Sequence, residues 1–171
     1  MTRAVLSLGS NLGDRAAHLR TVVADLGTAV VAVSPVFETA PWGVVDQPDF
    51  LNAVLVADDP ALDARGWLRR GRALEDASGR VREQRWGPRT LDVDVVQVTD
   101  DGAPVVSDDP ELLLPHPGTP ERATVLLPWL LAEPGAVLHG HGPVADLLDR
   151  LGPDGTAGVH RRDDVVLRAP A

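Results

Sequence analysis

The sequence predicts a single α+β domain, spanning residues 1–171, that is built on a mostly antiparallel sheet. Three observations support this. The 171 residues match one domain, since domains run to roughly 100–200 residues. Segments with strand and helix patterns follow one another in the order β-α-β-β-α-β over residues 3–98. The chain has no Cys, so its core must form without disulfides, and a chain of this size buries enough surface to do so.

Each element of this order shows a local signal. The helical segments carry apolar residues three and four positions apart, as at Leu19, Val22 and Leu26, whereas the strand segments are rich in Val. Pro35 interrupts the second strand segment, so part of it must be an edge or a bend. In chain order we expect a strand over 3–9, a helix over 15–26, strands over 29–39 and 50–57, a helix over 61–77 and a strand over 91–98.

Pro and Gly mark the loops. Two long loops rich in these residues, 40–48 and 79–88, separate the expected elements. Trp67 and Trp129 lie on expected helices and are assigned to the core. After residue 98 we expect a turn at 100–102, an irregular segment over 111–120, helices over 122–132 and 145–151, and a last strand over 159–167. The order over residues 3–98 is the split βαβ, or ferredoxin-like, arrangement, which serves many functions and decides none.

Composition excludes several classes of function. All 16 basic residues are Arg, so there is no lysine for a Schiff base or for a Gly-Lys-Ser/Thr phosphate loop. The net charge of −9 argues against nucleic-acid and membrane partners. No apolar run approaches the ~20 residues that span a bilayer, and no signal peptide is visible. We therefore expect a cytoplasmic protein.

Asp92 and Asp94 form the sharpest local signal. Residues i and i+2 of a strand share a face, so both carboxylates point to the side opposite Leu91, Val93 and Val95. A bound cation removes the repulsion between two such charges. Oxygen ligands without Cys suit Mg²⁺, which one or two carboxylates and substrate phosphates commonly hold. A solvated acidic face explains the pattern equally well when it is taken alone.

The loop before the two carboxylates is basic. Arg80, Arg82, Arg85 and Arg89 give residues 80–89 a charge of +3 after the one Glu is counted. Arg side chains facing a metal-binding pair are the arrangement that phosphoryl transfer requires. The alternative is a solvated loop that pairs with the acidic surface.

Aromatic and amide side chains lie beside the two loops. Trp42, Phe50 and Trp86 could present a flat face to a planar ligand, and Asn52 shares a strand face with Phe50 and could hydrogen-bond a heterocycle. Packing within the loops, or a sheet-to-loop hydrogen bond, would explain them without a ligand. Among the five His, only His116 stands out, because it lies between two prolines.

These segments together resemble the 6-hydroxymethyl-7,8-dihydropterin pyrophosphokinase family of folate biosynthesis. The resemblance runs in order from residue 4 to about residue 130. It rests on LGSNLGD (8–14), TAPWG (39–43), DQPDFLNA (46–53), Glu75, GRVR (79–82), RWGPRTLDVD (85–94), LPHP (114–117) and Arg122. The resemblance implies a Mg²⁺-dependent transferase that moves the pyrophosphoryl group of ATP onto the hydroxymethyl group of the pterin and releases AMP.

The resemblance also implies a role for each matched residue. Asp92 and Asp94 would hold two Mg²⁺ ions, and Arg82 and Arg89 would act with them in catalysis. ATP would be bound by Glu75, Arg80, Arg82, Trp86, Arg89, His116 and Arg122. The pterin would be bound by Thr39, Pro41, Gly43, Phe50, Asn52 and Thr124. The implied partners are these two small molecules, and a monomer is expected.

Two positions depart from the family pattern. Thr124 stands where an aromatic residue usually stacks on the pterin, and Arg72 stands where an amide is common near the nucleotide. Residues beyond about 133 match only loosely and receive no function. Two other classes of protein compete with this interpretation: a metal-dependent nucleotidyl transferase or nuclease, and a non-catalytic ligand-binding module.

Overall fold

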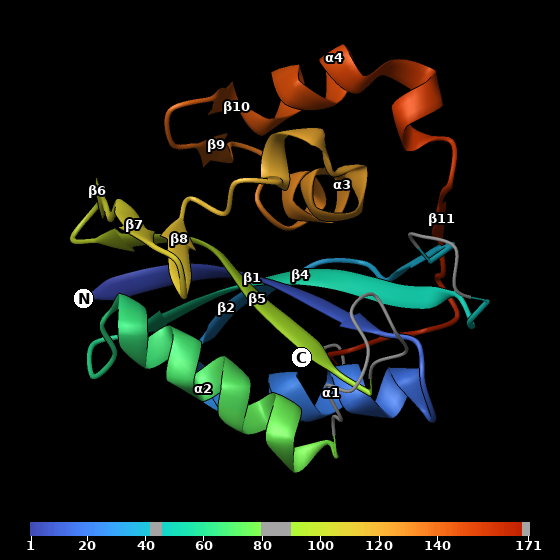
Figure 1. Ribbon diagram of the computed structural model, residues 1–171, viewed down its shortest axis with the longest axis horizontal. Coiled ribbons are helices and arrows are strands. Elements are labelled where there is room, and N and C mark those ends of the chain that lie inside the picture. The colour runs from blue at the N-terminus through green and yellow to red at the C-terminus, as the bar shows by residue number, and fades with distance from the viewer. Residues whose placement is uncertain (42–45, 80–89, 169–171) are drawn as a thin grey trace.

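A computed structural model describes residues 1–41, 46–79 and 90–168 of the chain. Its centre is a seven-stranded sheet in the order β11-β3-β4-β1-β5-β6, with β2 pairing to β4 next to β3. Helices cover both faces: α1 and α2 lie on one side, and α3 and α4 on the other (Figure 1). The described chain contains no helix long and apolar enough to cross a membrane.

The main sheet and its helices account for most of the described residues. The strands of this sheet are β1 (Thr2–Ser10), β2 (Val30–Val33), β3 (Phe37–Thr39), β4 (Phe50–Asp59), β5 (Asp92–Asp100), β6 (Ala103–Pro104) and β11 (Val159–Arg161). Two small hairpins are formed by β7 (Ser107–Asp109) with β8 (Leu112–Leu114) and by β9 (Val137–Leu138) with β10 (Gly142–Pro143). The helices are α1 (Arg15–Leu26), α2 (Ala64–Ala77), α3 (Ala123–Ala132) and α4 (Val144–Thr156), with short 3₁₀ turns at Gly27–Ala29 and Thr119–Glu121.

Strand alternation divides the core into two layers. On β1, Leu6 and Leu8 pack against the side of α1 and α2, with Leu19 and Trp67. Val5, on the other face of β1, packs toward α3 and α4 with Trp129. Both Trp side chains are buried, as the sequence predicted. Because odd and even positions of β1 face different layers, Ser7 and Gly9 belong to the α3 side.

Short polar side chains fix the helix starts. The carboxylate of Asp14 accepts the Ala17 N–H (3.1 Å) at the start of α1. The carboxylate of Asp63 accepts the Gly66 N–H (2.7 Å) at the start of α2. These contacts satisfy backbone donors that the first helical turn leaves without a partner. The α2 boundary therefore falls at residue 64 rather than at the expected residue 61.

The α+β, ferredoxin-like class predicted from the sequence is confirmed, and two predicted strands are wrong in extent. The segment 29–39 forms two strands, β2 and β3, because Pro35 cannot donate to a ladder; Ser34 instead exchanges hydrogen bonds with Val54 through its N–H (2.9 Å) and its hydroxyl (2.9 Å). The last strand ends at Arg161 rather than at residue 167.

Candidate functional site

Asp92 and Asp94 lie at the start of β5, on the α3 side of the sheet. In the register of β1 with β5, Gly9 is opposite Asp92 and Ser7 is opposite Asp94. Both Asp residues are half-buried. Val93, which lies between them, and Val95, which follows them, are buried on the opposite face of the sheet, in the layer of α1 and α2. The structure therefore confirms that the two carboxylates share one face of a strand.

Gly71 allows α2 to approach β5 closely at this point. A Cβ atom built on Gly71 would lie 3.1 Å from Cγ1 of Val93 and 3.5 Å from the Val93 carbonyl oxygen. The 3.1 Å separation is tighter than the ordinary van der Waals separation of roughly 3.5–4.0 Å between carbon atoms. The missing side chain at Gly71 thus sets how near the helix lies to the strand that carries the two carboxylates.

A first pocket, of about 200 Å³, opens on one side of the carboxylates. Its wall comes from β1, β3, β4, β5 and the start of α3. Of the residues assigned to the pterin, it contains Thr39, Phe50, Asn52 and Thr124, together with Asp92, Asp94 and Arg122. Four of the six residues predicted to bind the pterin, which lie on three separate segments, are therefore brought to one hollow.

Hydrogen bonding orients the polar end of this pocket. Asn52 donates from Nδ2 to the hydroxyl of Thr39 (2.8 Å), and its Oδ1 lies toward Gly9. A Cβ atom on Gly9 would come within 3.5 Å of that Oδ1 and 3.6 Å of the Phe50 ring. Gly9 therefore forms part of the pocket floor, and any side chain there would occupy space between Phe50 and Asp92.

A second pocket, of about 390 Å³, opens on the other side of the same carboxylates. It is lined by α2, β5, β8 and the segment before α3, including Glu75, His116 and Arg122 from the predicted ATP-binding set. Glu75 is buried on α2. Arg72 also lines this pocket and lies 3.7 Å from a carboxylate oxygen of Glu111, so its guanidinium is directed toward the pocket's acidic edge.

The surroundings of His116 favour the neutral form of its imidazole. Burial lowers the pKa of the ring, the nearby Arg122 guanidinium lowers it further, and the Asp92 carboxylate raises it. The Gly118 N–H donates to Nδ1 (3.4 Å), so the proton of the neutral ring is assigned to Nε2. A neutral His at this position can donate a hydrogen bond to an anionic oxygen.

Arg122 links the two pockets. It precedes the first residue of α3 and contributes to the lining of both hollows. Its side chain passes over Gly118, where a Cβ atom would lie 3.0 Å from Nε. The small residue at position 118 thus leaves room for the guanidinium.

Some predicted site residues are not tested by the structure. Gly43, Arg80, Arg82, Trp86 and Arg89 lie outside the described residues, as does Trp42. Pro41 is described and follows β3, but it is absent from the described lining of both pockets. Their roles remain predictions from the resemblance.

Sequence reasoning missed five residues of the first pocket, which are Ser7, Leu8, Gly9, Gln47 and Val125. Asn11 fixes the segment that carries Gln47, since its Nδ2 donates to Gln47 Oε1 (2.8 Å) and to the Pro48 carbonyl (3.0 Å). Alternation along the first strand would have placed Ser7 and Gly9 on one face. It could not have shown that this face lies beside Asp92 and Asp94.

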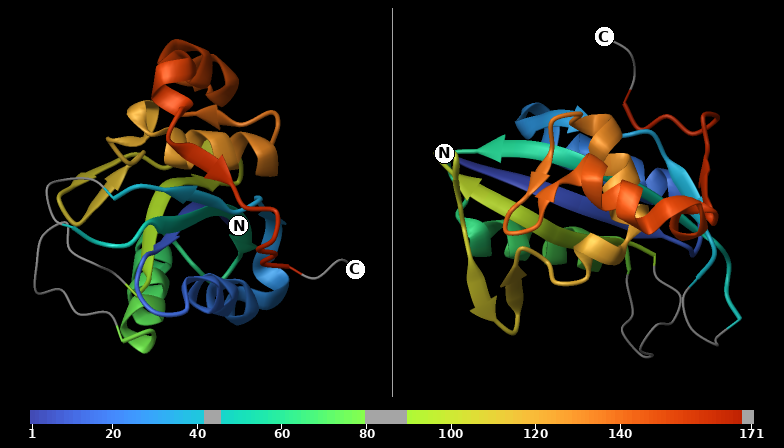
Figure 2. Two further views of the ribbon diagram at one scale, coloured as in Figure 1. Left: turned by 90° about the vertical axis from the view of Figure 1, so that its right-hand side faces the viewer. Right: turned by 90° about the horizontal axis from the view of Figure 1, so that it is seen from above.

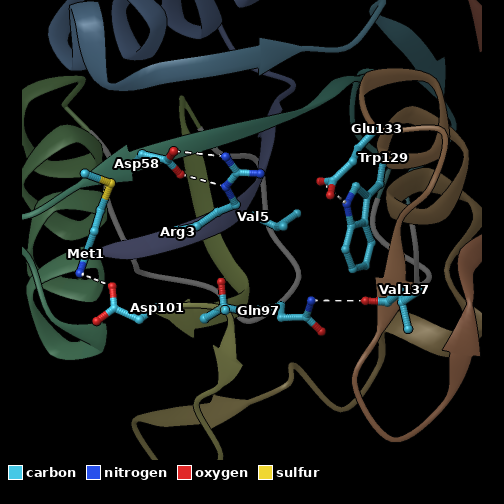
Figure 3. Close-up of a pocket in the computed structure, with 11 residues that line it drawn as sticks. Met1, Arg3, Val5, Asp58, Gln97, Asp101, Trp129, Glu133 and Val137 are labelled. Carbon is cyan, nitrogen blue, oxygen red and sulfur yellow. Dashed lines mark hydrogen bonds and ion pairs between the residues drawn. The ribbon is translucent and has the colours of Figure 1, made fainter.

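A larger hollow, of about 430 Å³, lies at the opposite end of the same sheet face. Figure 3 shows that its polar groups bind one another: Arg3 pairs with Asp58 (2.7 Å), and Gln97 donates to the Val137 carbonyl (3.1 Å). None of the sequence-predicted site residues that the structure describes lines it. Size alone therefore does not mark the functional site, and the junction of the two smaller pockets is the better candidate.

The fold and the site define a class of protein: a ferredoxin-like α+β enzyme with two small-molecule pockets that meet at a carboxylate pair. The family model for 7,8-dihydro-6-hydroxymethylpterin-pyrophosphokinase (HPPK) matches residues 5–134. The chain belongs to this family.

Curated relatives carry the corresponding name, 2-amino-4-hydroxy-6-hydroxymethyldihydropteridine pyrophosphokinase. The Mycobacterium tuberculosis protein is 52% identical over 161 residues, which cover 90% of this chain and 86% of the relative. The Methylorubrum extorquens protein is 46% identical over 163 residues, which cover 93% and 99% of the two chains.

A solved structure of similar fold is Plasmodium falciparum HPPK-DHPS wild type with SDX-DHP. It superposes with a TM-score of 0.63 at 15% identity and covers 94% of this chain. This chain spans 47% of the length of that solved chain. At such low identity the similarity concerns the fold alone.

Proposed function

We propose that this chain transfers the pyrophosphoryl group of ATP to 6-hydroxymethyl-7,8-dihydropterin. The hydroxymethyl oxygen attacks the β-phosphorus, the bond from that phosphorus to the α–β bridging oxygen breaks, and the hydroxyl proton is lost. The products are AMP and the pterin diphosphate. One observation carries the proposal: two separate pockets share Asp92, Asp94 and Arg122, so two substrates can meet there.

The residues present fit a magnesium site. Asp92 and Asp94 supply oxygen ligands from one strand face, and no group of three or more His, Cys, Asp or Glu side chains in the described part of the chain forms a complete metal cage. Mg²⁺ suits such a partial set, because it is commonly held by one or two carboxylates plus substrate phosphates. When bound, Mg²⁺ would neutralise phosphate charge and orient the triphosphate; the family resemblance implies two ions.

Each pocket matches one substrate. The first combines the aromatic ring of Phe50 with the amide of Asn52, which suits a planar heterocycle with donor and acceptor edges. The second holds His116 and Arg122 near the carboxylates, where they would bind phosphate oxygens. Glu75 and Arg72 of α2 line the same pocket. Catalysis would then come from positioning and charge stabilisation, without a covalent enzyme intermediate.

The basic loop would complete the nucleotide site. Arg82 and Arg89 would stabilise the transferred group, and Arg80 and Trp86 would contact ATP, as the family resemblance implies. Gly43 and Pro41 would border the pterin. We further propose that residues 1–171 form one cytoplasmic domain that acts as a monomer.

Product identification tests the function directly. The purified chain is incubated with ATP, Mg²⁺ and the hydroxymethyl-dihydropterin, and the nucleotide products are separated by chromatography. With ATP labelled at the β-phosphate, the label should move to the pterin and unlabelled AMP should accumulate. Formation of ADP, release of free pyrophosphate without pterin labelling, or absence of a reaction would contradict the proposal.

A further inference from the structure

The strand that carries Thr39 has few contacts of its own. β3 contains three residues and pairs with β4, placing Glu38 opposite Leu51 and Thr39 opposite Phe50. Residues 34–36, which include Pro35, separate it from β2. If it were paired with β4 alone, a strand this short would open easily and would hold a binding residue poorly.

The C-terminal segment covers the other edge of β3. In β11, Val159 lies opposite Thr39, His160 opposite Glu38 and Arg161 opposite Phe37. The Arg162 N–H extends the contact by donating to the Val36 carbonyl (2.8 Å). Figure 1 shows β11 at this end of the sheet, remote in sequence from β3 and beside it in space.

An ionic network of Arg15, Glu38 and Arg162 joins this segment to the pocket wall, and Arg162 also pairs with Asp164 within the segment (2.7 Å). Glu38 accepts hydrogen bonds from Nη1 of Arg15 (2.7 Å) and from Nη1 of Arg162 (3.1 Å). Arg15 Nη1 also donates to the carbonyl of Asp49 (2.9 Å), the residue directly before Phe50. The network therefore connects the segments that carry Thr39 and Phe50, both of which line the first pocket.

Glu38 acts from behind the pocket. Alternation along β3 places Thr39 on the α3 side and Glu38 on the opposite side, where Arg15 of α1 reaches it. Neither Glu38 nor Arg162 is among the described residues that line the two pockets. Any influence on substrate must pass through Thr39 and Phe50.

The end of the segment is held in the main core. Leu167 is 8% exposed and belongs to the cluster formed with α1 and α2, and the Val166 carbonyl accepts a hydrogen bond from Arg20 Nε of α1 (2.9 Å). Figure 2 shows the same C-terminal segment running from α4 along the edge of the sheet. The segment is thus fixed at both ends, by pairing with β3 and by burial of Leu167.

We propose that residues 159–168, here called the C-terminal strap, position the pterin-binding strand β3, with Arg162 and Glu38 as positioning residues. This inference rests on the proposed function, because it concerns how firmly the pterin pocket is held. It assigns a role to a part of the chain beyond the matched family model, which ends at residue 134.

Arg162→Ala and its neighbour Arg161→Ala form a matched pair for the test. Arg161 pairs only with Asp163 among the described residues and is 51% exposed, whereas Arg162 contacts Glu38. For each full-length variant we would measure kcat and the KM of both substrates, using AMP formation. Backbone hydrogen exchange of Phe37, Glu38 and Thr39 gives a second readout that does not depend on activity.

Arg162→Ala should raise the KM for the pterin roughly three- to fivefold, the range of one partly exposed ionic contact. The KM for ATP and kcat should stay within about twofold of the wild type, and Arg162→Lys should recover part of the loss. Backbone hydrogen exchange in β3 should become faster in Arg162→Ala and should not change in Arg161→Ala.

Equal pterin KM values for Arg162→Ala and Arg161→Ala would overturn the strap proposal, as would equal increases for both substrates. A wild-type chain that forms no AMP would contradict the proposed function instead. In that case unchanged exchange in β3 of Arg162→Ala would still overturn the strap, and faster exchange would support it.

Discussion

Replacing Gly71 by Ala tests whether close packing of α2 on β5 sets the position of the two carboxylates. Ala would gain about 1 kcal/mol from helix propensity. Its Cβ, however, would lie 3.1 Å from Val93 Cγ1, and overpacking of this kind costs ~1–3 kcal/mol. The expected net change is a loss of about 0–2 kcal/mol in the free energy of unfolding, measured by urea denaturation.

The functional effect should exceed this modest loss of stability. Val93 lies between Asp92 and Asp94, so a displaced Val93 shifts both carboxylates, and a misplacement of about 1 Å can cost ~100-fold in rate. We therefore expect the Mg²⁺ concentration for half-maximal AMP formation to rise in Gly71→Ala.

Val93→Ala supplies the compensating change. Alone it removes a buried side chain at a cost of about 2 kcal/mol, but in the Gly71→Ala background it makes room for the new methyl group. The pair should couple favourably by about 1 kcal/mol, and the Mg²⁺ requirement should return toward that of the wild type. The reasoning would be refuted if the changes in unfolding free energy of the two single variants simply added in the double variant. A Gly71→Ala chain as active and as stable as the wild type would also refute it.

Three further outcomes follow from the site and the strap. Gly9→Ala should weaken pterin binding several-fold in a titration, because its methyl group occupies the pocket floor, while the melting temperature changes little. Thr124→Phe should tighten pterin binding by up to roughly tenfold, since an added ring contact contributes ~0.5–1.5 kcal/mol; unchanged affinity would show that the pterin does not lie against residue 124. The Arg15 hydrogen bond, with the charges of Arg15 and then Arg162, outweighs the effect of burial and lowers the pKa of Glu38. Its stabilising ionic contacts are therefore present at neutral pH and lost as the pH falls below about 5 through the lowered value. Unfolding free energy should consequently decline less between about pH 5 and 3 in Glu38→Gln than in the wild type, and equal slopes would contradict this.

Local patterns accounted for most of the central fold. Helix α1 was predicted with the observed bounds because its apolar spacing is a local pattern. The hairpins β7–β8 and β9–β10 were not predicted: each has strands of two or three residues, too short for an alternation to be recognised. Their pairing depends on contacts that the sequence does not display.

Part of the candidate site could also be predicted from a local pattern. The shared face of Asp92 and Asp94 follows from strand geometry alone, and the structure confirms it. That the carboxylates lie between two pockets could not be read from residue patterns, since it depends on how β1, β4 and α3 meet around β5. The strap was missed because the pairing of β11 with β3 joins residues more than 100 positions apart.

The most direct test of the central claim is the rate of AMP formation by Asp92→Asn and Asp94→Asn, at saturating ATP, pterin and Mg²⁺. Asp108→Asn is the matched control, because Asp108 is exposed on β7 and is not among the described residues that line either pocket. Each site variant should lose about 100-fold or more in rate while remaining folded, since the Asn side chain has nearly the same shape and its neutral amide removes the repulsion between the two carboxylates. Near-wild-type rates in either site variant, or an equal loss in Asp108→Asn, would contradict the claim that the two substrates meet at this carboxylate pair.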